Sequence, residues 1–357
     1  MDDVVGRIAA DALALCAIAA PTFTEAERGR AMAEMLRAAG ARPATDPAGN
    51  VLARFGPDDG EAAIVTAHLD TVFPAGTPLD ARREGDRLRG PGVGDDCLGL
   101  AALLHLARRL AAAAPQRPVL LAATVGEEGL GDLRGAKAVL DEHRCRAFVA
   151  LEGHGRDNLQ TAGIGSARIR ARATGPGGHS WGDRGTPSAV HALVGALEAA
   201  TRAAGERHIN VGVIAGGTSI NTIAAEATAE IDLRDGDDAA LERTRDAVAA
   251  ALRDAVPGGI DLELEPIGRR PAGATPGDHP LVQAARAARA AAGLAAAEED
   301  ASSTDANAAM GRGIAAIGVG LTHGMHAHRT DEVVELAPLG AGIAVVDHLV
   351  DALGMGA

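Results

Sequence analysis

The chain has 357 residues, of which 47% are hydrophobic and 23% charged, and its formal net charge is −14. A chain of this length is expected to form two domains, because single cores rarely grow beyond about 250–300 residues. The negative charge disfavours contact with phosphate backbones, so no nucleic-acid partner is expected. Three widely spaced cysteines form neither a disulfide framework nor a zinc knuckle, and the expected compartment is the cytoplasm.

The N-terminal segment, residues 1–21, has the pattern of an amphipathic helix. It is acidic where a signal peptide would be basic, so we do not interpret it as one. No apolar run in the chain is long enough to cross a bilayer, and no membrane partner is expected.

Apolar runs alternate with helical patterns in the first part of the chain and again near its end. Continuous apolar runs separated by helices predict an α/β fold with a mostly parallel sheet covered by helices on both faces. In such sheets, ligands bind beyond the carboxyl ends of the strands. The predicted helices are 25–39 and 98–113, and the predicted strands are 62–67, 119–125, 147–151 and 314–319.

The middle of the chain has a different pattern, with strands that alternate apolar and polar residues. The order of its elements, β-α-β-β-α-β, is the ferredoxin-like arrangement. We therefore expect an inserted α+β domain at 165–267, which divides the α/β domain into 1–164 and 268–357. The predicted strands are 166–174, 210–215, 227–234 and 260–264, and the predicted helices are 187–204 and 238–256.

Acidic residues and histidines stand at the downstream edge of several apolar stretches. Because the carboxyl ends of parallel strands share one edge of a sheet, these side chains are expected to form a single site. Together they offer ligands for two divalent metal ions and a spare carboxylate that can activate water. The set comprises His68, Asp70, Asp95, Asp96, Glu127, Glu128, Glu152 and His328.

Each of these motifs also has a purely structural interpretation. Asp95 and Asp96 suit the positive end of a helix dipole, in a glycine-rich turn that leads into a helix. The adjacent Glu127 and Glu128 can lie in a solvated loop, although two neighbouring carboxylates after a buried strand are costly unless neutralised. His179, in GPGGHSWGDRG, can be an ordinary loop histidine. The combination of motifs is more specific than any one of them.

In combination, the motifs resemble those of the M20 metallopeptidases, the group of carboxypeptidase G, peptidase T, acetylornithine deacetylase and succinyl-diaminopimelate desuccinylase. The resemblance covers nearly the whole chain, and its motifs come in the family's order. HLDTV is similar to the first metal motif, GVGDDCLG to the bridging-aspartate motif, VGEEG to the catalytic-base motif and LEG to the third-carboxylate position. STDAN followed by AHRTDE resembles the closing metal motif, and GPGGHSWGDRGTPSAVHAL the start of the lid or dimerisation domain.

The resemblance implies a set of metal ligands. Asp95 would bridge two metal ions. His68 and Glu152 would complete one metal site, and Glu128 and His328 would complete the other. The expected ions are zinc, with cobalt or manganese as substitutes, since ligand type alone does not separate zinc from manganese.

The resemblance also implies roles for the remaining site residues. Asp70 would orient the histidine ligand, and Glu127 would act as general base and then as general acid. His179 matches a lid histidine that reaches the partner subunit's site and polarises the scissile carbonyl. Asn221 in GGTSINTIA and Arg234 in IDLR match residues that contact substrate, the arginine through a carboxylate.

The expected function is therefore metal-assisted hydrolysis of an amide bond in a small peptide. The protein would be an exopeptidase or dipeptidase of the peptidase T or carboxypeptidase type, and a homodimer formed through the inserted domain. One alternative is an N-acyl-amino-acid deacylase of the acetylornithine deacetylase type, or a hydrolase of an unusual amide. Another is a non-catalytic binding protein of the same fold, which the presence of every expected ligand disfavours.

Some positions depart from the family's pattern. Cys97 and Leu98 stand where lysine and glycine usually follow the bridging aspartate, and Ala224 stands where a proline is frequent. The closing motif reads HR where HT is usual, and His326 competes with His328 as the ligand. None of these departures removes an expected ligand, so metal binding is expected to persist. A change in the surroundings of the ligands, in the metal preference or in the substrate stays open.

Overall fold

The computed structural model describes residues 2–355, which form two compact units. The first unit comprises the described residues up to Gly163 and from Ala274 onward, and the second is Ile164–Gly273. The second unit extends past the expected boundary at 267, because strand β14 (Asp261–Arg270) continues to Arg270, which pairs with Ser166. No described helix is long and apolar enough to span a membrane.

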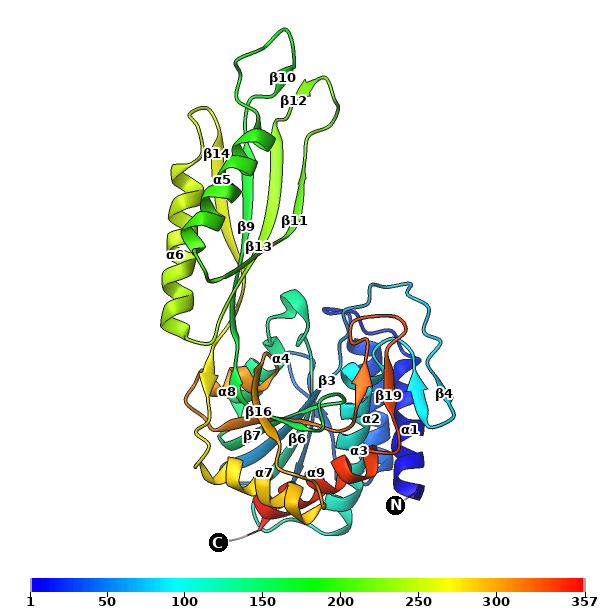
Figure 1. Ribbon diagram of the computed structural model, residues 1–357. Helices are drawn as coiled ribbons and strands as arrows, with labels where there is room; N and C mark the ends of the chain where they lie inside the picture. The colour runs from blue at the N-terminus through cyan, green and yellow to red at the C-terminus, as the bar shows by residue number, and fades with distance from the viewer. Residues whose placement is uncertain (1, 356–357) are drawn as a thin grey trace. The chain divides into compact units, whose positions relative to one another are not determined.

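A nine-stranded sheet forms the centre of the described part of the first unit (Figure 1). Its strands are β1 (Ala44–Thr45), β2 (Val51–Phe55), β3 (Ala62–His68), β6 (Val119–Thr124), β7 (Cys145–Glu152), β8 (Asn158–Gly163), β15 (Gly273–Ala274), β16 (Glu298–Ser302) and β17 (Ala316–Gly320). Their order is β1-β2-β6-β3-β7-β17-β8-β15, with β16 beside β8. The central strands β6, β3, β7 and β17 are parallel.

Helices cover both faces of this sheet. Side chains alternate between the faces along a strand, so Val65 packs in a core with Leu103, whereas Ile64 packs on the opposite face with Val139. The predicted mixed α/β fold with a mostly parallel sheet is confirmed. The first face is covered by α1 (Asp2–Cys16), α2 (Ala26–Ala38), α3 (Gly99–Ala112), α7 (Pro280–Ala291) and α9 (Leu339–Gly354), and the second by α4 (Arg134–Glu142) and α8 (Ala306–Met310).

A small antiparallel sheet lies beside the candidate site and was not predicted. Its strands are β4 (Arg82–Glu84), β5 (Arg87–Arg89), β18 (Gly324–Met325) and β19 (Val333–Glu335), in the order β18-β19-β5-β4. The short turn η1 (Val93–Leu98) follows β5 and leads into α3, and the turn η2 (Gly129–Gly131) follows β6. This sheet therefore joins the loop that carries His328 to the segment that leads to Asp95.

The second unit is a four-stranded antiparallel sheet with two helices. Its further elements are β9 (Gly165–Thr174), α5 (Ala189–Ala204), β11 (His208–Gly216), β13 (Glu226–Asp235) and α6 (Asp238–Asp254). The strand order β11-β13-β9-β14 with β-α-β-β-α-β connectivity is a ferredoxin-like arrangement. Helix α5 begins at Ala189, two residues later than predicted, because Ser188 keeps an extended backbone.

Candidate metal centre

The carboxyl edge of the parallel strands gathers most of the predicted site residues. His68 ends β3 and Glu152 ends β7, while Glu127 and Glu128 follow β6. Asp95 lies in η1, immediately before α3. Since β3 lies between β6 and β7 in the sheet, these side chains project from neighbouring strand ends.

Asp95 lies between two imidazoles. Its Oδ1 is 2.8 Å from Nε2 of His68, and its Oδ2 is 2.9 Å from Nε2 of His328. The same Nε2 of His328 is 3.4 Å from Oε1 of Glu128. A carboxylate whose two oxygens address different partners has the arrangement of a ligand that bridges two cations.

The donor set fits a divalent cation. Ligand atoms of His68, Asp95 and Glu128 all lie within 4.8 Å of one another. Oε1 of Glu128 is buried, and its contact with Nε2 of His328 at 3.4 Å is too long for a good hydrogen bond, which is costly for a carboxylate unless a cation satisfies it. Imidazole nitrogens and carboxylate oxygens are ligands that zinc and manganese share.

The electrostatics of this cluster also favour a cation. Burial raises the pKa of Glu128 to about 7 and raises the pKa of Glu152 well above its usual range, and the nearby charge of Asp95 adds to both shifts. The adjacent carboxylates of Asp95 and then Glu128 raise the pKa of His328 to about 10. Carboxylates that repel one another in a buried site retain protons until a positive charge stabilises their ionised forms.

Asp70 supports its neighbours in two ways. Its backbone oxygen is 2.9 Å from Nδ1 of His68, whereas its nearest carboxylate oxygen is 3.6 Å away. The carboxylate accepts hydrogen bonds from the backbone N–H groups of Glu127 and Glu128, both at 2.9 Å. The histidine is therefore held mainly by the backbone of Asp70, while the side chain fixes the segment that carries the two glutamates.

Glu127 is buried beside Glu128 and has a second buried carboxyl group near it. Asp305, at the start of α8, accepts a hydrogen bond from the Thr124 hydroxyl at 2.6 Å. Burial raises the pKa of Asp305 to about 7, and the charge of Glu127 adds to this shift. Asp305 lies in the STDAN segment, so this motif contributes a buried carboxyl group beneath the candidate site.

Glu332 and His154 also support the site, and the sequence did not predict their contribution. Oε1 of the buried Glu332 accepts the backbone N–H groups of Asp95 at 3.0 Å and Gly94 at 3.2 Å, and it also contacts Nε2 of His154. His154 lies two residues after Glu152 in the chain. Glu332 thus connects the loop that carries Asp95, the end of β7 and the segment that carries His328.

The geometry distinguishes the two histidines of the closing motif. His328 faces Asp95, whereas Nδ1 of His326 lies 3.2 Å from a carboxylate oxygen of Asp331. Cys97, at the position that departs from the family's pattern, is buried, and its backbone N–H donates to the oxygen of Gly92. The thiol of Cys16 contacts the same oxygen, so Cys97 lies next to α1.

The remaining predicted residues belong to the second unit. His179 lies in a short ribbon formed by β10 (Gly178–His179) and β12 (Thr222–Ile223), and the backbone oxygen of Asn221 accepts the N–H of Ser180. Arg234 lies near the other end of β13, where its Nε contacts a carboxylate oxygen of Asp232 at 2.7 Å. Eight residue steps separate Arg234 from the start of β13, about 26 Å of strand, so His179 and Arg234 lie at opposite ends of this unit.

The fold and the site define a class of protein, an α/β protein with a cluster of histidines and carboxylates suited to divalent metals. Comparison with known proteins identifies its family. The sequence profile of peptidase family M20/M25/M40 matches residues 64–352, and the chain therefore belongs to this family. Members of the M20 family are metallo-hydrolases that act on peptide or amide bonds, and the resemblance drawn from the motifs is confirmed.

Curated relatives match part of the chain. A protein of Mycobacterium tuberculosis assigned as the succinyl-diaminopimelate desuccinylase DapE is 31% identical over 245 residues, 64% of this chain and 65% of the relative. Carboxypeptidase G2 from a Pseudomonas species is 27% identical over 199 residues, 52% of this chain and 47% of the relative. The chain thus spans from about half to just under two thirds of these relatives.

Solved structures match the fold over nearly the whole chain. The aminopeptidase PepT from Bacillus cereus superposes with a TM-score of 0.77 at 20% identity and 98% coverage of both chains. A dinuclear metal-binding M20 peptidase from Bacillus subtilis superposes with a TM-score of 0.70 at 16% identity and 99% coverage of both chains. At these identities the likeness establishes the shared fold.

Proposed function

We propose that this protein hydrolyses an amide bond in a small peptide, as an exopeptidase or dipeptidase. The observation that carries the proposal is the position of Asp95, whose two carboxylate oxygens each face the Nε2 of a different histidine. Glu127 lies in the same buried cluster without being needed as a ligand. Such an arrangement offers two cation sites and a separate proton acceptor.

The metal ligands follow from this arrangement. His68, Asp95 and Glu152 would hold one cation, and Asp95, Glu128 and His328 would hold the other. When bound, two divalent cations polarise a carbonyl oxygen and make water acidic enough to lose a proton near neutral pH. We expect zinc in both sites, with manganese or cobalt as substitutes.

Glu127 would move the proton. It would accept a proton from the attacking water and later deliver the proton to the departing amine nitrogen, as a general base and then a general acid. Asp70 supports this role because its carboxylate holds the backbone N–H of Glu127. A base whose backbone is already fixed needs less rearrangement of the main chain to reach the water.

His179 and Arg234 would contact the substrate. Nδ1 of His179 accepts the backbone N–H groups of Trp181 and Gly182, both at 3.2 Å. The neutral ring then carries its proton on Nε2, which can donate to a developing oxyanion. Arg234 would pair with a substrate carboxylate, and Asn221 would add a polar contact.

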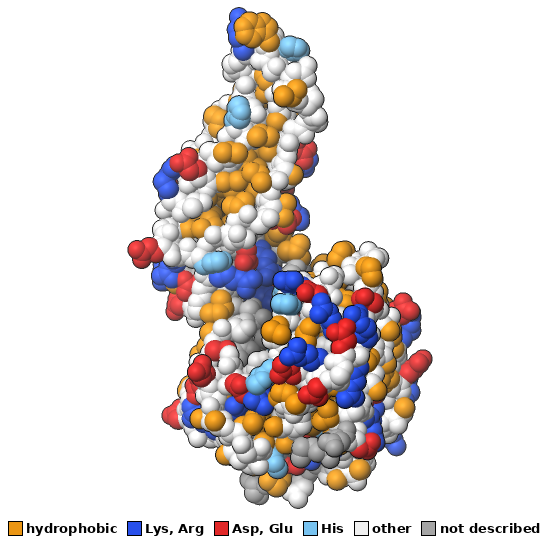
Figure 2. Space-filling view, turned by 45° about the vertical axis from the view of Figure 1, so that its right-hand side comes forward, with side chains coloured by type: hydrophobic (Ala, Val, Ile, Leu, Met, Phe, Trp, Pro, Cys, Tyr) orange, Lys and Arg blue, Asp and Glu red, His pale blue; other side chains and the backbone are white. Residues whose placement is uncertain are grey.

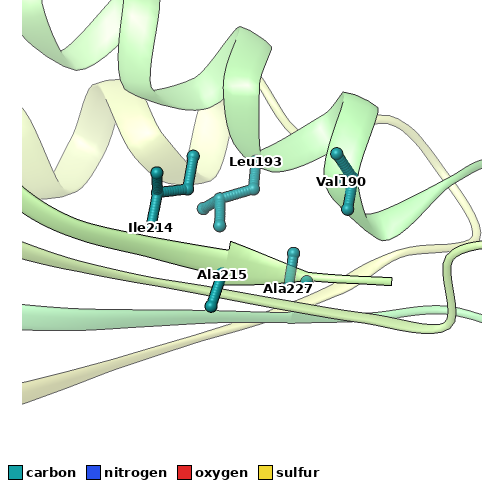
Figure 3. A pocket seen from close by; sticks show the side chains of 6 residues that line it. Val190, Leu193, Ile214, Ala215 and Ala227 are labelled. Atoms are coloured by element: carbon teal, nitrogen blue, oxygen red, sulfur yellow. The ribbon is translucent and has the colours of Figure 1, made fainter. Parts of the chain in front are cut away.

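Homodimerisation through the second unit completes the proposal, with His179 of one subunit serving its partner. Strand β11 is at the edge of its sheet, and Val213 and Ile214 on it are 50% and 55% exposed. Figure 2 shows hydrophobic side chains gathered on this unit. Next to the strand, Val190 and Leu193 of α5 line an apolar groove with Ile214 (Figure 3). An apolar edge strand of this kind can pair with β11 of a second copy about a twofold axis.

We also infer that the protein works in the cytoplasm. Its cysteines are unpaired in the structure, and two of them are buried. Reduced thiols of this kind fit a compartment that does not form disulfides. Fractionation of cells that express the full chain tests this inference.

A deacylase is the second candidate function. The 31% identical relative assigned as a desuccinylase favours it, because such an enzyme cleaves an N-acyl amide with the same bond chemistry. The metal centre does not separate the two functions, since both cleave a C–N bond next to a carbonyl. The difference lies in the groups on either side of that bond.

A mass-spectrometric hydrolysis screen tests the proposal. Purified protein with added zinc or manganese is incubated with a panel of di- and tripeptides and N-acyl amino acids, with a chelator-treated control. Chelator-sensitive cleavage of peptides supports the exopeptidase and shows which end is read. Cleavage of N-acyl amino acids alone supports the deacylase, and no cleavage of either class contradicts both.

A further inference from the structure

Exposed apolar side chains in the first unit gather near the candidate metal centre. The described part of this unit exposes five large hydrophobic side chains. Three of them lie close in sequence to site residues, and a fourth follows a residue that contacts Asp70. These four, which we call the apolar rim, are Phe23 (61% exposed), Val72 (39%), Leu130 (39%) and Met325 (50%). The fifth, Met355, lies at the C-terminal end of the described residues.

Short segments connect the apolar rim to the site. Val72 follows Asp70 by two positions, and Leu130 follows Glu128 by two positions. Met325, in β18, precedes the loop that carries His328. An exposed apolar cluster beside polar functional groups is typical of a ligand-binding surface.

Phe23 is next to the site through its chain neighbour. The hydroxyl of Thr22 donates to a carboxylate oxygen of Asp70 at 2.9 Å. A parallel bridge between Pro21 and Thr71 places the segment before Phe23 alongside the segment that leads to Val72. Phe23 and Val72 thus emerge from adjacent segments at the carboxyl edge of the sheet.

The backbone of Phe23 is held in an unfavourable conformation. Its φ of 75° lies in the left-handed region, which is unfavourable for a residue with a side chain. The Phe23 N–H donates to Oε1 of the buried Glu25 at 3.0 Å. The two carboxylate oxygens of Glu25 accept hydrogen bonds from Nη2 of Arg134 at 2.7 Å and 2.8 Å. The Arg134 guanidinium lies 5.6 Å from the centre of the Phe23 ring. These contacts hold the ring exposed instead of buried.

An exposed aromatic residue at position 23 is unusual for this chain. The chain has four Phe, one Trp and no Tyr, so aromatic side chains are scarce. One of them is 61% exposed, on a strained backbone, next to a residue that contacts the site. Strain that persists with the side chain exposed does not stabilise the core, and it points to a role in binding.

We propose that the apolar rim binds an apolar side chain of the substrate beside the cleaved amide bond, with Phe23 as the principal contact. This inference rests on the proposed function and names its substrate class, which is peptides or N-acyl amino acids with an aliphatic or aromatic side chain. Burial of such a side chain against the Phe23 ring removes apolar surface from water, which favours binding. A charged side chain there would lose hydration, and the nearby Arg134 guanidinium is already paired with Glu25.

Two hydroxamates provide the test, because they share a metal-binding group and differ only in the side chain. The affinities of zinc-loaded full-length protein for phenylalanine hydroxamate and glycine hydroxamate are measured by titration calorimetry. The variants are Phe23→Gly, Phe23→Leu and Val72→Ser, and the control is Met355→Ala, an exposed apolar residue at the chain end. Phe23→Gly suits this test because glycine adopts a positive φ without strain.

The expected results separate binding from folding. Phe23→Gly should weaken phenylalanine hydroxamate binding roughly tenfold, as the loss of one aromatic contact predicts, and leave glycine hydroxamate within about twofold. Its Tm should equal or exceed that of the unmodified protein, because the strain is removed. Phe23→Leu should recover part of the affinity, and Val72→Ser should lose a smaller part of it.

Two outcomes contradict the inference in different ways. If the unmodified protein binds both hydroxamates and neither Phe23→Gly nor Val72→Ser changes their ratio, the apolar rim does not select the side chain. If the zinc-loaded unmodified protein binds neither hydroxamate, the metal centre of the proposed function fails, and the inference that rests on it falls too.

Discussion

The carboxylates of the candidate centre differ in the groups that they contact. Asp95 faces two histidines, whereas the side chain of Asp70 accepts backbone N–H groups and so fixes the segment that carries Glu127. The role of each carboxylate thus depends on its partners more than on its position in a motif.

Replacing Glu127 by alanine is expected to lower kcat by roughly 10²–10⁴-fold, the usual contribution of a general base. Metal content should not change, because Glu127 is not one of the proposed ligands. Turnover of a cleaved substrate and metal content by mass spectrometry are the measurements, with the exposed Glu142→Ala variant as the matched control. Turnover that survives in the Glu127 variant would remove this residue from the base role.

Asp305 is expected to make the metal-free protein less stable as pH rises. Burial raises its folded-state pKa to about 7, whereas the unfolded chain has a pKa of about 3.9. Between these values the folded state binds more protons than the unfolded state, so the free energy of unfolding falls with increasing pH. The Asp305→Asn substitution removes this effect. The stability of this variant relative to the unmodified protein should therefore be higher at pH 8 than at pH 5.

Urea unfolding of the metal-free protein at pH 5 and pH 8 measures this effect. The unmodified protein should lose about 2–3 kcal/mol more than Asp305→Asn between the two conditions. The other titrating groups are shared, so the difference between the two proteins measures Asp305 together with its interaction with Glu127. Parallel pH profiles would show that its carboxyl group titrates normally.

At the scale of elements, burial determined which strands the sequence could predict. Strands β3 and β6 are buried along their whole length, so their apolar runs are continuous and the predictions were confirmed. Strand β4, in contrast, consists of exposed Arg82–Glu84 and has no apolar pattern. Its pairing with β5 defines it, and that pairing has no signal in the sequence.

The end of β14 illustrates a second cause of error. The sequence prediction stopped the strand at 264, before Pro266 and a nearby glycine. In the structure the strand continues past a register shift between Pro266 and Gly268 and then pairs with β9 again as far as Arg270. A proline at an edge strand with a bulge interrupts the pattern without ending the strand.

The candidate site was predictable where it follows strand ends and hidden where it depends on tertiary contacts. His68, Glu128 and Glu152 follow apolar runs, so their convergence could be expected from a parallel sheet. Glu332 contacts the backbone of Asp95 across 237 positions of sequence. Only the packing of its loop against η1 reveals that contact.

Glu332→Ala is expected to weaken both folding and metal binding. It removes the acceptor of two N–H groups, those of Gly94 and the partly buried Asp95, and leaving them unsatisfied costs about 1–3 kcal/mol. Asp95 then loses its anchor, so zinc affinity should fall. Glu332→Gln keeps an acceptor oxygen and should recover most of both properties.

Chemical denaturation and competition with a zinc chelator measure the two effects. Glu335→Ala is the matched control, because Glu335 lies in the same segment but contacts Arg87 at the surface. Equal zinc affinity in Glu332→Ala and the unmodified protein would contradict a positioning role. Failure of Glu332→Gln to recover affinity would show that the negative charge is needed.

For the whole molecule, the alternation of patterns along the chain was enough to predict an insertion of ferredoxin-like connectivity. The structure contains that connectivity in the second unit. The role of this unit in dimerisation and in supplying His179 stays a prediction. A single chain contains no direct signal of its partner except exposed apolar surface.

A Val213→Lys and Ile214→Lys double variant is expected to be monomeric. Two charges on the edge strand β11 oppose pairing with a second copy. Sedimentation velocity over a range of concentrations measures the state, and Glu263→Lys on the opposite edge strand β14 is the control. A monomeric variant that keeps full activity would refute the role of His179 in the partner's site.

The number of bound metal ions per chain tests the two-cation centre. Purified protein is dialysed against zinc, and bound ions per chain are counted by mass spectrometry for the unmodified protein and for Asp95→Ala. The proposed centre predicts two ions in the unmodified protein and the loss of both tightly bound ions in Asp95→Ala, since this residue bridges both sites. One ion or none in the unmodified protein, or two ions retained by Asp95→Ala, would contradict the two-cation centre.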